Sequence, residues 1–452
     1  MDLSIDPLDL DVVEWADAVA FSVPMHTAMR LARTACSEIR ARRPDAAVCF
    51  YGLYAGLDGA MGTTPLADSA IAGEYEPGLL QWVDALGPAG ALRRAHRGDH
   101  AFVSLGRGRF GLPARDLLPG LDRYARLAAA GDLRLVGYVE ASHGCAHRCR
   151  HCPVPVVYDG RTRLVGVDAV LADVAQLVDM GARHLTFGDA DFLNGPHHAR
   201  RVVDAVHGAF PSLTFDVTAK VEHVLRHREL WPGLAAAGCV FVVSAFESAS
   251  DAILALLDKG HRVADEVEAV GVLRAAGIEP RPSLLPFTPW STAGDVLDLL
   301  DLVARCDLIG NVDPVQFAIR LLVPPGSLLL SCGALTGRVG RYDDEHLGWT
   351  WSAPDPRLDR LHDDLTAIAA RAGAEEWSPA HAYDEVRAHA VAAFGPDARG
   401  RRTPPCPDPR LRSGLGPEER PRLTESWFCC AEPNDAQVVT VRAGPAAPVG
   451  GC

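Results

Sequence analysis

The sequence has 452 residues, enough for two or three domains of about 150 residues each. Its 48% hydrophobic and 23% charged residues are typical of globular proteins, which excludes a mainly disordered, collagen-like or coiled-coil chain. The net charge of −14 argues against a broad nucleic-acid-binding surface, and 12 cysteines are too few for a disulfide scaffold.

The first residues are acidic and lack the basic and apolar regions of a signal peptide. No uncharged apolar run approaches the roughly 18 residues of a membrane span. We therefore expect a cytoplasmic protein without membrane or nucleic-acid partners. Its cysteines are then free thiols, metal ligands or catalytic groups.

Residues 1–90 alternate apolar runs with helical patterns, which predicts a small Rossmann-like domain with a parallel sheet. Its first strand lies close to Met1, as in a domain clipped at its start. Residues 91–132 are expected to be a connector with one short helix near 118–129. The expected strands of the first domain lie at 17–23, 46–52 and 70–73.

Six strand–helix units follow, which predicts a partial (β/α)6 barrel over residues 133–330 and an overall α/β fold class. Residues 331–395 are expected to be a helical region, 396–425 a Pro/Arg-rich linker with little core, and 426–452 an apolar tail. The expected barrel strands lie near 134–142, 184–192, 213–221, 239–247, 278–287 and 313–323.

Cys145, Cys149 and Cys152 follow the first barrel strand with the spacing C-x3-C-x2-C. Three thiolates can hold three irons of a four-iron cluster and leave one iron open, since such clusters usually take four cysteines. Active sites of barrels form at the carboxyl ends of strands, which favours a catalytic cluster. The alternative is a zinc site. Its fourth ligand would be His143, His147 or His151.

This loop on a partial barrel resembles the radical S-adenosylmethionine (SAM) superfamily over about residues 130–330. The resemblance implies that Cys145, Cys149 and Cys152 bind a [4Fe-4S] cluster and that SAM chelates the open iron. It also implies one-electron cleavage of SAM to methionine and a 5′-deoxyadenosyl radical, with a flavodoxin- or ferredoxin-like electron donor.

Polar residues end two further barrel strands. Through the resemblance, Asp189 or Asp191, near Gly188, contacts the amino group of SAM, and Glu247, beside Ser248, contacts its ribose or amino acid part. The residues alone leave two structural alternatives open, an Asx turn at the aspartates and a helix cap at Glu247 and Ser248.

Residues 10–90 resemble the cobalamin-binding-like domain that precedes many radical SAM barrels. The Asp-x-His-x-x-Gly motif of many such domains is absent, and His26 is expected to start a helix instead. Cobalamin bound without a His ligand and a relic domain both remain open.

Cys429 and Cys430 stand side by side in SWFCCAEP. Neighbouring side chains of a strand point opposite ways, so the two cannot both be buried on one face. They are either unrelated surface thiols or a soft-ligand or redox pair. Cys429–Pro433 reads CCAEP. This pentapeptide resembles the tail of a group of radical SAM proteins, which ends in CCAEP or in CUAEP, where selenocysteine (U) stands at the position of Cys430. This resemblance implies a catalytic role for both thiols.

We therefore predict a radical SAM enzyme that acts on an unidentified small-molecule or metalloid-containing substrate, assisted by the thiol tail. One alternative is a cobalamin-dependent radical SAM methyltransferase. The other is a non-catalytic protein with a zinc or other metal site.

Overall fold

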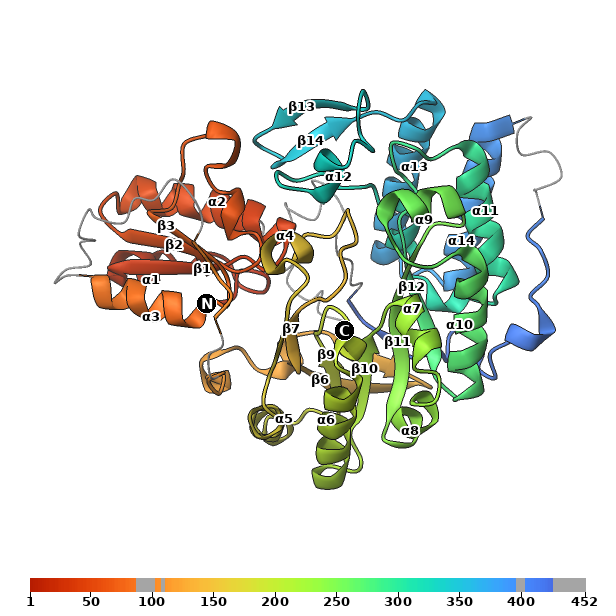
Figure 1. Ribbon diagram of the computed structural model, residues 1–452, viewed down its shortest axis with the longest axis horizontal. Coiled ribbons are helices and arrows are strands. Elements are labelled where there is room, and N and C mark those ends of the chain that lie inside the picture. Colours follow the sequence, from red (N-terminus) through yellow and green to blue (C-terminus); the bar gives the residue numbers. More distant parts are fainter. Residues whose placement is uncertain (87–101, 107–109, 396–402, 426–452) are drawn as a thin grey trace, which may run out of the picture.

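The computed structural model describes residues 1–86, 102–106, 110–395 and 403–425. They form a small amino-terminal sheet and a larger curled sheet with helices on its outer face (Figure 1). The predicted α/β class, a partial barrel behind a Rossmann-like domain, is confirmed. Among the described helices, none is both long and apolar enough to cross a membrane.

The amino-terminal sheet has four parallel strands in the order β1-β2-β3-β4. Met29 and Ile39 of α2 are buried against Val48 and Phe50 of β2. His26 is the first residue of α2, as predicted, and β4 comes from the expected connector. The elements are α1 (Leu10–Trp15), β1 (Ala18–Ser22), α2 (His26–Arg42), β2 (Ala47–Tyr51), β3 (Ser69–Gly73), α3 (Glu76–Ala85) and β4 (Phe102–Ser104).

The larger sheet has the strand order β12-β11-β10-β9-β6-β5-β15. Strands β6 and β9 to β12 are parallel, whereas β5 and β15 are each antiparallel to their neighbours. The helix expected near 118–129 is wrong. Ala130 and Gly131 both have left-handed backbones, and this tight turn joins β5 to β6 as a hairpin.

Helices pack on the outer face of this sheet and form its main core, with α5 contributing Val170, Val174 and Leu177. The elements are β5 (Arg126–Ala129), β6 (Asp132–Val139), β7 (Ser142–Gly144), α4 (Val154–Tyr158), β8 (Thr162–Leu164), α5 (Val167–Asp179), β9 (His184–Phe187), α6 (Pro196–Ala209), β10 (Thr214–Thr218), α7 (Val221–Arg226), α8 (Trp231–Ala236), β11 (Cys239–Glu247), α9 (Asp251–Leu257), α10 (Val263–Ala275), β12 (Glu279–Leu284) and α11 (Ala293–Arg305).

The sixth predicted strand, 313–323, is wrong. Pro314 starts a 3-10 helix, Pro314–Ala318, and only an isolated bridge joins Phe287 to Arg320. Proline has no N–H for a sheet and favours the first turn of a helix, which explains the difference. Arg320 forms an ion pair with Asp359 at 2.8 Å.

Residues 331–395, expected to be helical, hold the antiparallel pair β13–β14 as well as helices, and α14 lies between α13 and α11 (Figure 1). The expected linker with little core, residues 396–425, is described over 403–425, and this part packs on the barrel and buries Leu411 and Arg420. Cys239 and Cys306 are buried, whereas Cys332 is exposed. The elements are α12 (Leu328–Ser331), β13 (Val339–Asp343), β14 (Gly348–Trp351), α13 (Pro356–Ala374), α14 (Pro379–Phe394) and β15 (Arg422–Leu423).

Candidate functional site

The three motif cysteines lie on the loop beyond β6 and β7, at the carboxyl end of a barrel strand. Cys145 and Cys149 are buried, Cys152 is half-buried, and all three are free thiols. Gly144 precedes them with a φ of 75°, and a Cβ there would lie 2.3 Å from the carbonyl oxygen of Arg161. Only glycine fits this turn, which brings the loop to the mouth of the barrel.

Burial dominates the electrostatics of these thiols and keeps them neutral in the absence of a metal. Burial raises the pKa of Cys145 to about 12, and burial also raises the pKa of Cys149. Lys259 and Lys220 oppose the rise at Cys149, while the charge of Cys152 acts on both other thiols. Thiols in such a site ionise when a metal binds among them. The three cysteines therefore fit the three-thiolate ligation of a four-iron cluster.

Asp191, after β9, connects the cysteine loop to α7. Its Oδ2 lies 3.3 Å from Nε2 of His147 and 2.9 Å from Nδ1 of His223. Burial alone would raise the pKa of Asp191, but the two neighbouring histidines hold it below its ordinary value. Its Oδ1 accepts from the backbone N–H of Leu193. The carboxylate thus fixes the first half of the loop from the end of β9.

Glu247, the last residue of β11, holds the second half of the same loop. Its Oε1 lies 3.2 Å from Nε2 of His151 and 2.9 Å from Nζ of Lys259. Burial would raise the pKa of Glu247, yet Lys259 and His151 keep it well below the ordinary range. Both contacts use Oε1, which leaves Oε2 for a ligand hydroxyl or ammonium group.

Asp189 fixes the start of the loop. Its carboxylate accepts hydrogen bonds from the backbone N–H of Ala141 and the hydroxyl of Ser142. Burial raises the pKa of Asp189 to about 7 in spite of these two bonds. Gly188 lies against Tyr138, whose hydroxyl would be 1.9 Å from a Cβ at position 188. Both predicted residues thus take part in packing around the loop.

The structure gathers the barrel residues of the predicted site around one loop. Ser248 is buried beside Glu247, and its N–H donates to the carbonyl of Phe246. Cys429 and Cys430 lie outside the described residues. His223 and Lys259 were missed by the sequence analysis, because neither belongs to a motif. The position of His223 shortly after β10 could have indicated the site, because parallel strand ends meet at one edge, whereas Lys259 follows α9 and carries no such signal.

His147, Asp191 and His223 bring three potential metal-ligand atoms within 4.8 Å of one another. However, Nζ of Lys220 lies 3.3 Å from Nδ1 of His147. A metal-bound histidine usually donates its second ring N–H to an acceptor, whereas a lysine ammonium is itself a donor. The contact instead favours a proton on Nε2 of His147, directed at Asp191. None of the three facing atoms makes a hydrogen bond with a described residue, so we interpret the trio as an ion-paired support of the loop.

The amino-terminal domain touches the cysteine-loop region directly. Glu74, which follows β3 and is buried, lies 3.3 Å from Nδ1 of His143 on β7, and burial together with the charge of Glu74 raises the pKa of Tyr158 on α4. Burial lowers the pKa of His143, but Glu140 and Glu74 together raise it to about 10. The carboxyl edge of the first sheet thus faces the mouth of the barrel, and β3 contacts α4 there.

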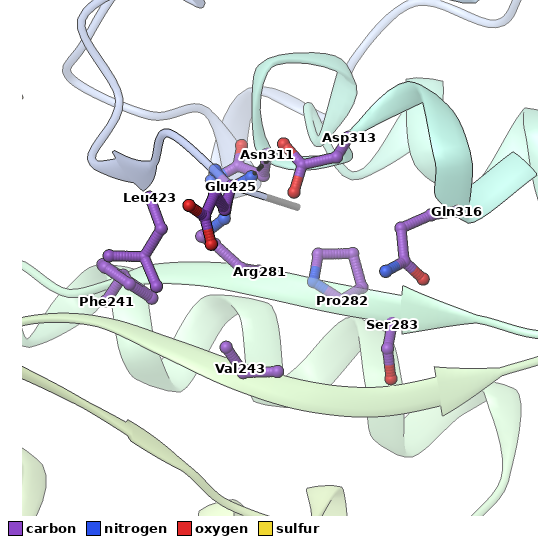
Figure 2. A pocket seen from close by; sticks show the side chains of 10 residues that line it. All are labelled: Phe241, Val243, Arg281, Pro282, Ser283, Asn311, Asp313, Gln316, Leu423 and Glu425. Atoms are coloured by element: carbon purple, nitrogen blue, oxygen red, sulfur yellow. Dashed lines mark hydrogen bonds and ion pairs between the residues drawn. The ribbon is translucent and has the colours of Figure 1, made fainter. Parts of the chain in front are cut away.

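A small pocket of about 30 Å³ lies on the inner face of the curled sheet (Figure 2). Arg281 on β12 lies within it and forms an ion pair with Asp313 at 2.7 Å. Its walls mix apolar and polar side chains from β11, β12 and the carboxyl-terminal segment. The lining residues are Phe241, Val243, Arg281, Pro282, Ser283, Asn311, Asp313, Gln316, Leu423 and Glu425.

Residues 139–303 match the radical SAM superfamily. Over 214 residues the chain is 23% identical to an uncharacterized methyltransferase of Pyrococcus horikoshii, covering 47% of this chain and 44% of that relative.

Two solved structures share the fold. The chain is similar to OxsB, a cobalamin-dependent S-adenosylmethionine radical enzyme, with a TM-score of 0.58, 14% identity and coverage of 78% of this chain and 59% of OxsB. It is similar to TsrM, a radical S-adenosylmethionine methyltransferase from Kitasatospora setae, with a TM-score of 0.52, 16% identity and coverage of 96% and 87%. The chain thus spans less than half of the curated relative and about three fifths of OxsB.

Proposed function

We propose that the protein is a radical SAM enzyme, because residues 139–303 match the radical SAM superfamily, and that it generates a 5′-deoxyadenosyl radical that acts on a small-molecule or metalloid-containing substrate. The observation that carries this proposal is the cysteine loop itself. Three thiols stand at the carboxyl end of β6 on a loop held by Asp189, Asp191 and Glu247.

Cys145, Cys149 and Cys152 would hold the [4Fe-4S] cluster. When bound, the cluster and SAM together supply reductive cleavage to methionine and the radical. An external low-potential electron donor of the flavodoxin or ferredoxin kind would provide the electron.

The chain's own residues prepare the site. Asp191 and Glu247 fix the loop histidines, so that the thiols keep one geometry. Oε2 of Glu247 is the carboxylate oxygen that we assign to a ribose hydroxyl or ammonium group of SAM. We retain Asp189 and Asp191, with Gly188 and Ser248, as the wall of the same SAM site. Cys429 and Cys430 would bind the substrate or complete its turnover.

The test is anaerobic reconstitution of the full chain with iron and sulfide. We expect about four irons per chain, and 5′-deoxyadenosine from SAM with a low-potential reductant. Folded protein that binds zinc but neither iron nor SAM would overturn the proposal and support the metal-site alternative.

A second candidate is a cobalamin-dependent methyltransferase. Two observations favour it: the parallel sheet that meets the cysteine-loop region at Glu74, and fold similarity to OxsB and TsrM. The described residues contribute no Asp-x-His-x-x-Gly motif, so a corrinoid would bind without a histidine ligand from that motif. Corrinoid absorption in the purified protein, together with methylated product, distinguishes this candidate from the first.

A further inference from the structure

Lysine is rare in this chain and is confined to one place in the fold. Of the 44 basic residues, two are lysines and 42 are arginines (44 − 2). Both lysines, Lys220 and Lys259, are buried, with exposed fractions of 9% and 3%. Lysine carries its charge on one compact ammonium, whereas arginine spreads the charge over a planar fork. The two positions therefore provide point charges inside the protein, and both lie beside the cysteine loop.

Lys220 reaches the first half of the cysteine loop. It is the N-cap residue of α7, and its Nζ donates to Nδ1 of His147 at 3.3 Å. Its ion-pair partner Glu222 lies farther away, at 3.5 Å, and the side chain of Glu222 is 26% exposed. Water reaches the carboxylate more easily than the ammonium, and it screens exposed charges more than buried ones. Lys220 therefore keeps much of its positive field inside the site.

Lys259 reaches the second half of the loop. Asp258, with a left-handed φ of 57°, ends α9 and turns the chain at this point. Nζ of Lys259 then lies 2.9 Å from Oε1 of Glu247, a buried carboxylate that offsets its charge. The next residue, Gly260, lies against the other lysine, since a Cβ there would be 3.4 Å from Nζ of Lys220. One turn thus brings the two lysines together.

The carboxyl end of α9 also holds the loop next to these lysines. The backbone N–H of Arg150 donates to the carbonyl of Leu257 at 2.9 Å, and the guanidinium of Arg150 donates to the carbonyl of Leu256 at 3.1 Å. Arg150 directly follows Cys149 in the sequence. The middle cysteine of the motif is therefore fixed within the field of the two ammonium groups.

We propose that Lys220, beside the balanced pair of Lys259 and Glu247, is a positioning residue that raises the reduction potential of the iron–sulfur cluster held by the three cysteines. A [4Fe-4S] core with three thiolates has a net charge of about −1 when oxidised. One electron from the flavodoxin- or ferredoxin-like donor makes this charge about −2, and no bond forms or breaks. A buried cation nearby stabilises the second state more than the first. The inference rests on the proposed function for the presence of the cluster.

A redox titration followed by electron paramagnetic resonance measures this potential in the reconstituted full chain. Lys220→Met removes the charge, and we expect the reduction equilibrium to shift at least about tenfold toward the oxidised cluster, which is about 59 mV for one electron. Lys220→Arg keeps a charge and should recover most of the shift. The control is Arg148→Met, next to Cys149, because the Arg148 side chain is 61% exposed. It should change the equilibrium by less than about twofold.

Glu222→Gln provides a change of opposite sign. It removes the anion beside Lys220 at a partly exposed position, so the potential should rise. The proposal is overturned if Lys220→Met keeps about four irons and the potential of the parent protein. It is also overturned if Lys220→Arg shows the same shift as Lys220→Met, since a lost shape and not a lost charge would then be the cause. If Lys220→Met binds no cluster, an unchanged or lower potential in Glu222→Gln overturns it.

The potential and the formation of 5′-deoxyadenosine are separate readouts. A parent protein that forms no cluster would refute the proposed function. A parent protein that forms both the cluster and 5′-deoxyadenosine, with the same potential in Lys220→Met, would refute this inference alone.

Discussion

His151, between two cysteines of the loop, and Glu247, at the end of β11, meet with Nε2 and Oε1 3.2 Å apart. The same oxygen of Glu247 lies 2.9 Å from Nζ of Lys259. One buried carboxylate thus connects the cysteine loop to a lysine whose charge also acts on Cys149. The loop, the end of β11 and Lys259 should therefore respond together to a change at any of them.

Replacing Glu247 tests this connection. In Glu247→Gln the shape remains, but Lys259 keeps a buried charge without its anion. Breaking such a pair typically costs about 3–5 kcal/mol. We expect the free energy of unfolding, measured in urea, to fall by this amount, and iron content after reconstitution to fall with it.

The matched control is Glu268→Gln, which breaks an ion pair with Arg228 between side chains that are 51% and 54% exposed. An exposed pair of this kind contributes about 1 kcal/mol or less. An equal loss of unfolding free energy in the two variants would show that the Glu247 contacts stabilise the protein no more than an exposed ion pair does.

The cysteines can be separated by replacing one at a time. We expect Cys149→Ser to lose the cluster and all 5′-deoxyadenosine formation, because a serine hydroxyl replaces one of three thiolates. Cys332→Ser, at an exposed position, should keep both. Iron and sulfide analysis together with chromatographic detection of 5′-deoxyadenosine provides the readout. Full iron content in Cys149→Ser would remove this cysteine from the cluster.

The buried position of His26 leads us to predict that the protein loses stability in acid. Burial lowers its pKa from 6.5 to about 4, with Nε2 placed 3.4 Å from the carbonyl oxygen of Leu347. Below pH 6.5 His26 binds a proton in the unfolded chain, whereas in the folded protein it binds one only near pH 4. Stability is therefore complete above 6.5 and declines as the pH falls toward 4, by at most about 3 kcal/mol from this group.

Urea unfolding across this pH range measures the effect. In His26→Gln, whose amide can still donate to Leu347, the slope should become shallower. His381→Gln, at an exposed position of α14, should keep the slope of the parent protein. Parallel curves for His26→Gln and the parent would exclude His26 as a source of acid sensitivity.

Much of the fold and of the site can be predicted from local sequence patterns. Apolar runs and cysteine spacing locate β6, β9, β10, β11 and the loop, because these signals lie within a few residues. The β5–β15 pair cannot be predicted in this way. It joins Leu127 to Leu423, and nothing near either residue reports the distant partner.

The support of the loop was predicted only in part. His147 and His151 entered the sequence analysis as alternative zinc ligands, whereas the structure directs their Nε2 atoms to Asp191 and Glu247. Residue type alone does not decide between a metal and a carboxylate as the partner of a histidine. The three-dimensional position of each carboxylate decides it.

Gly144 provides the sharpest test of the loop's backbone. It has a φ of 75°, and a Cβ there would lie 2.3 Å from the carbonyl oxygen of Arg161 and 2.6 Å from the ring of Tyr158. A left-handed alanine costs about 1–2 kcal/mol, and crowding adds about 1–3 kcal/mol because a backbone oxygen cannot turn aside. We expect Gly144→Ala to lose both stability and iron binding, measured by urea unfolding and iron analysis. Gly166→Ala is the matched control, because nothing lies within 4 Å of its new Cβ. If Gly144→Ala binds as much iron as Gly166→Ala, the tight turn at the start of the loop is not what positions the thiols.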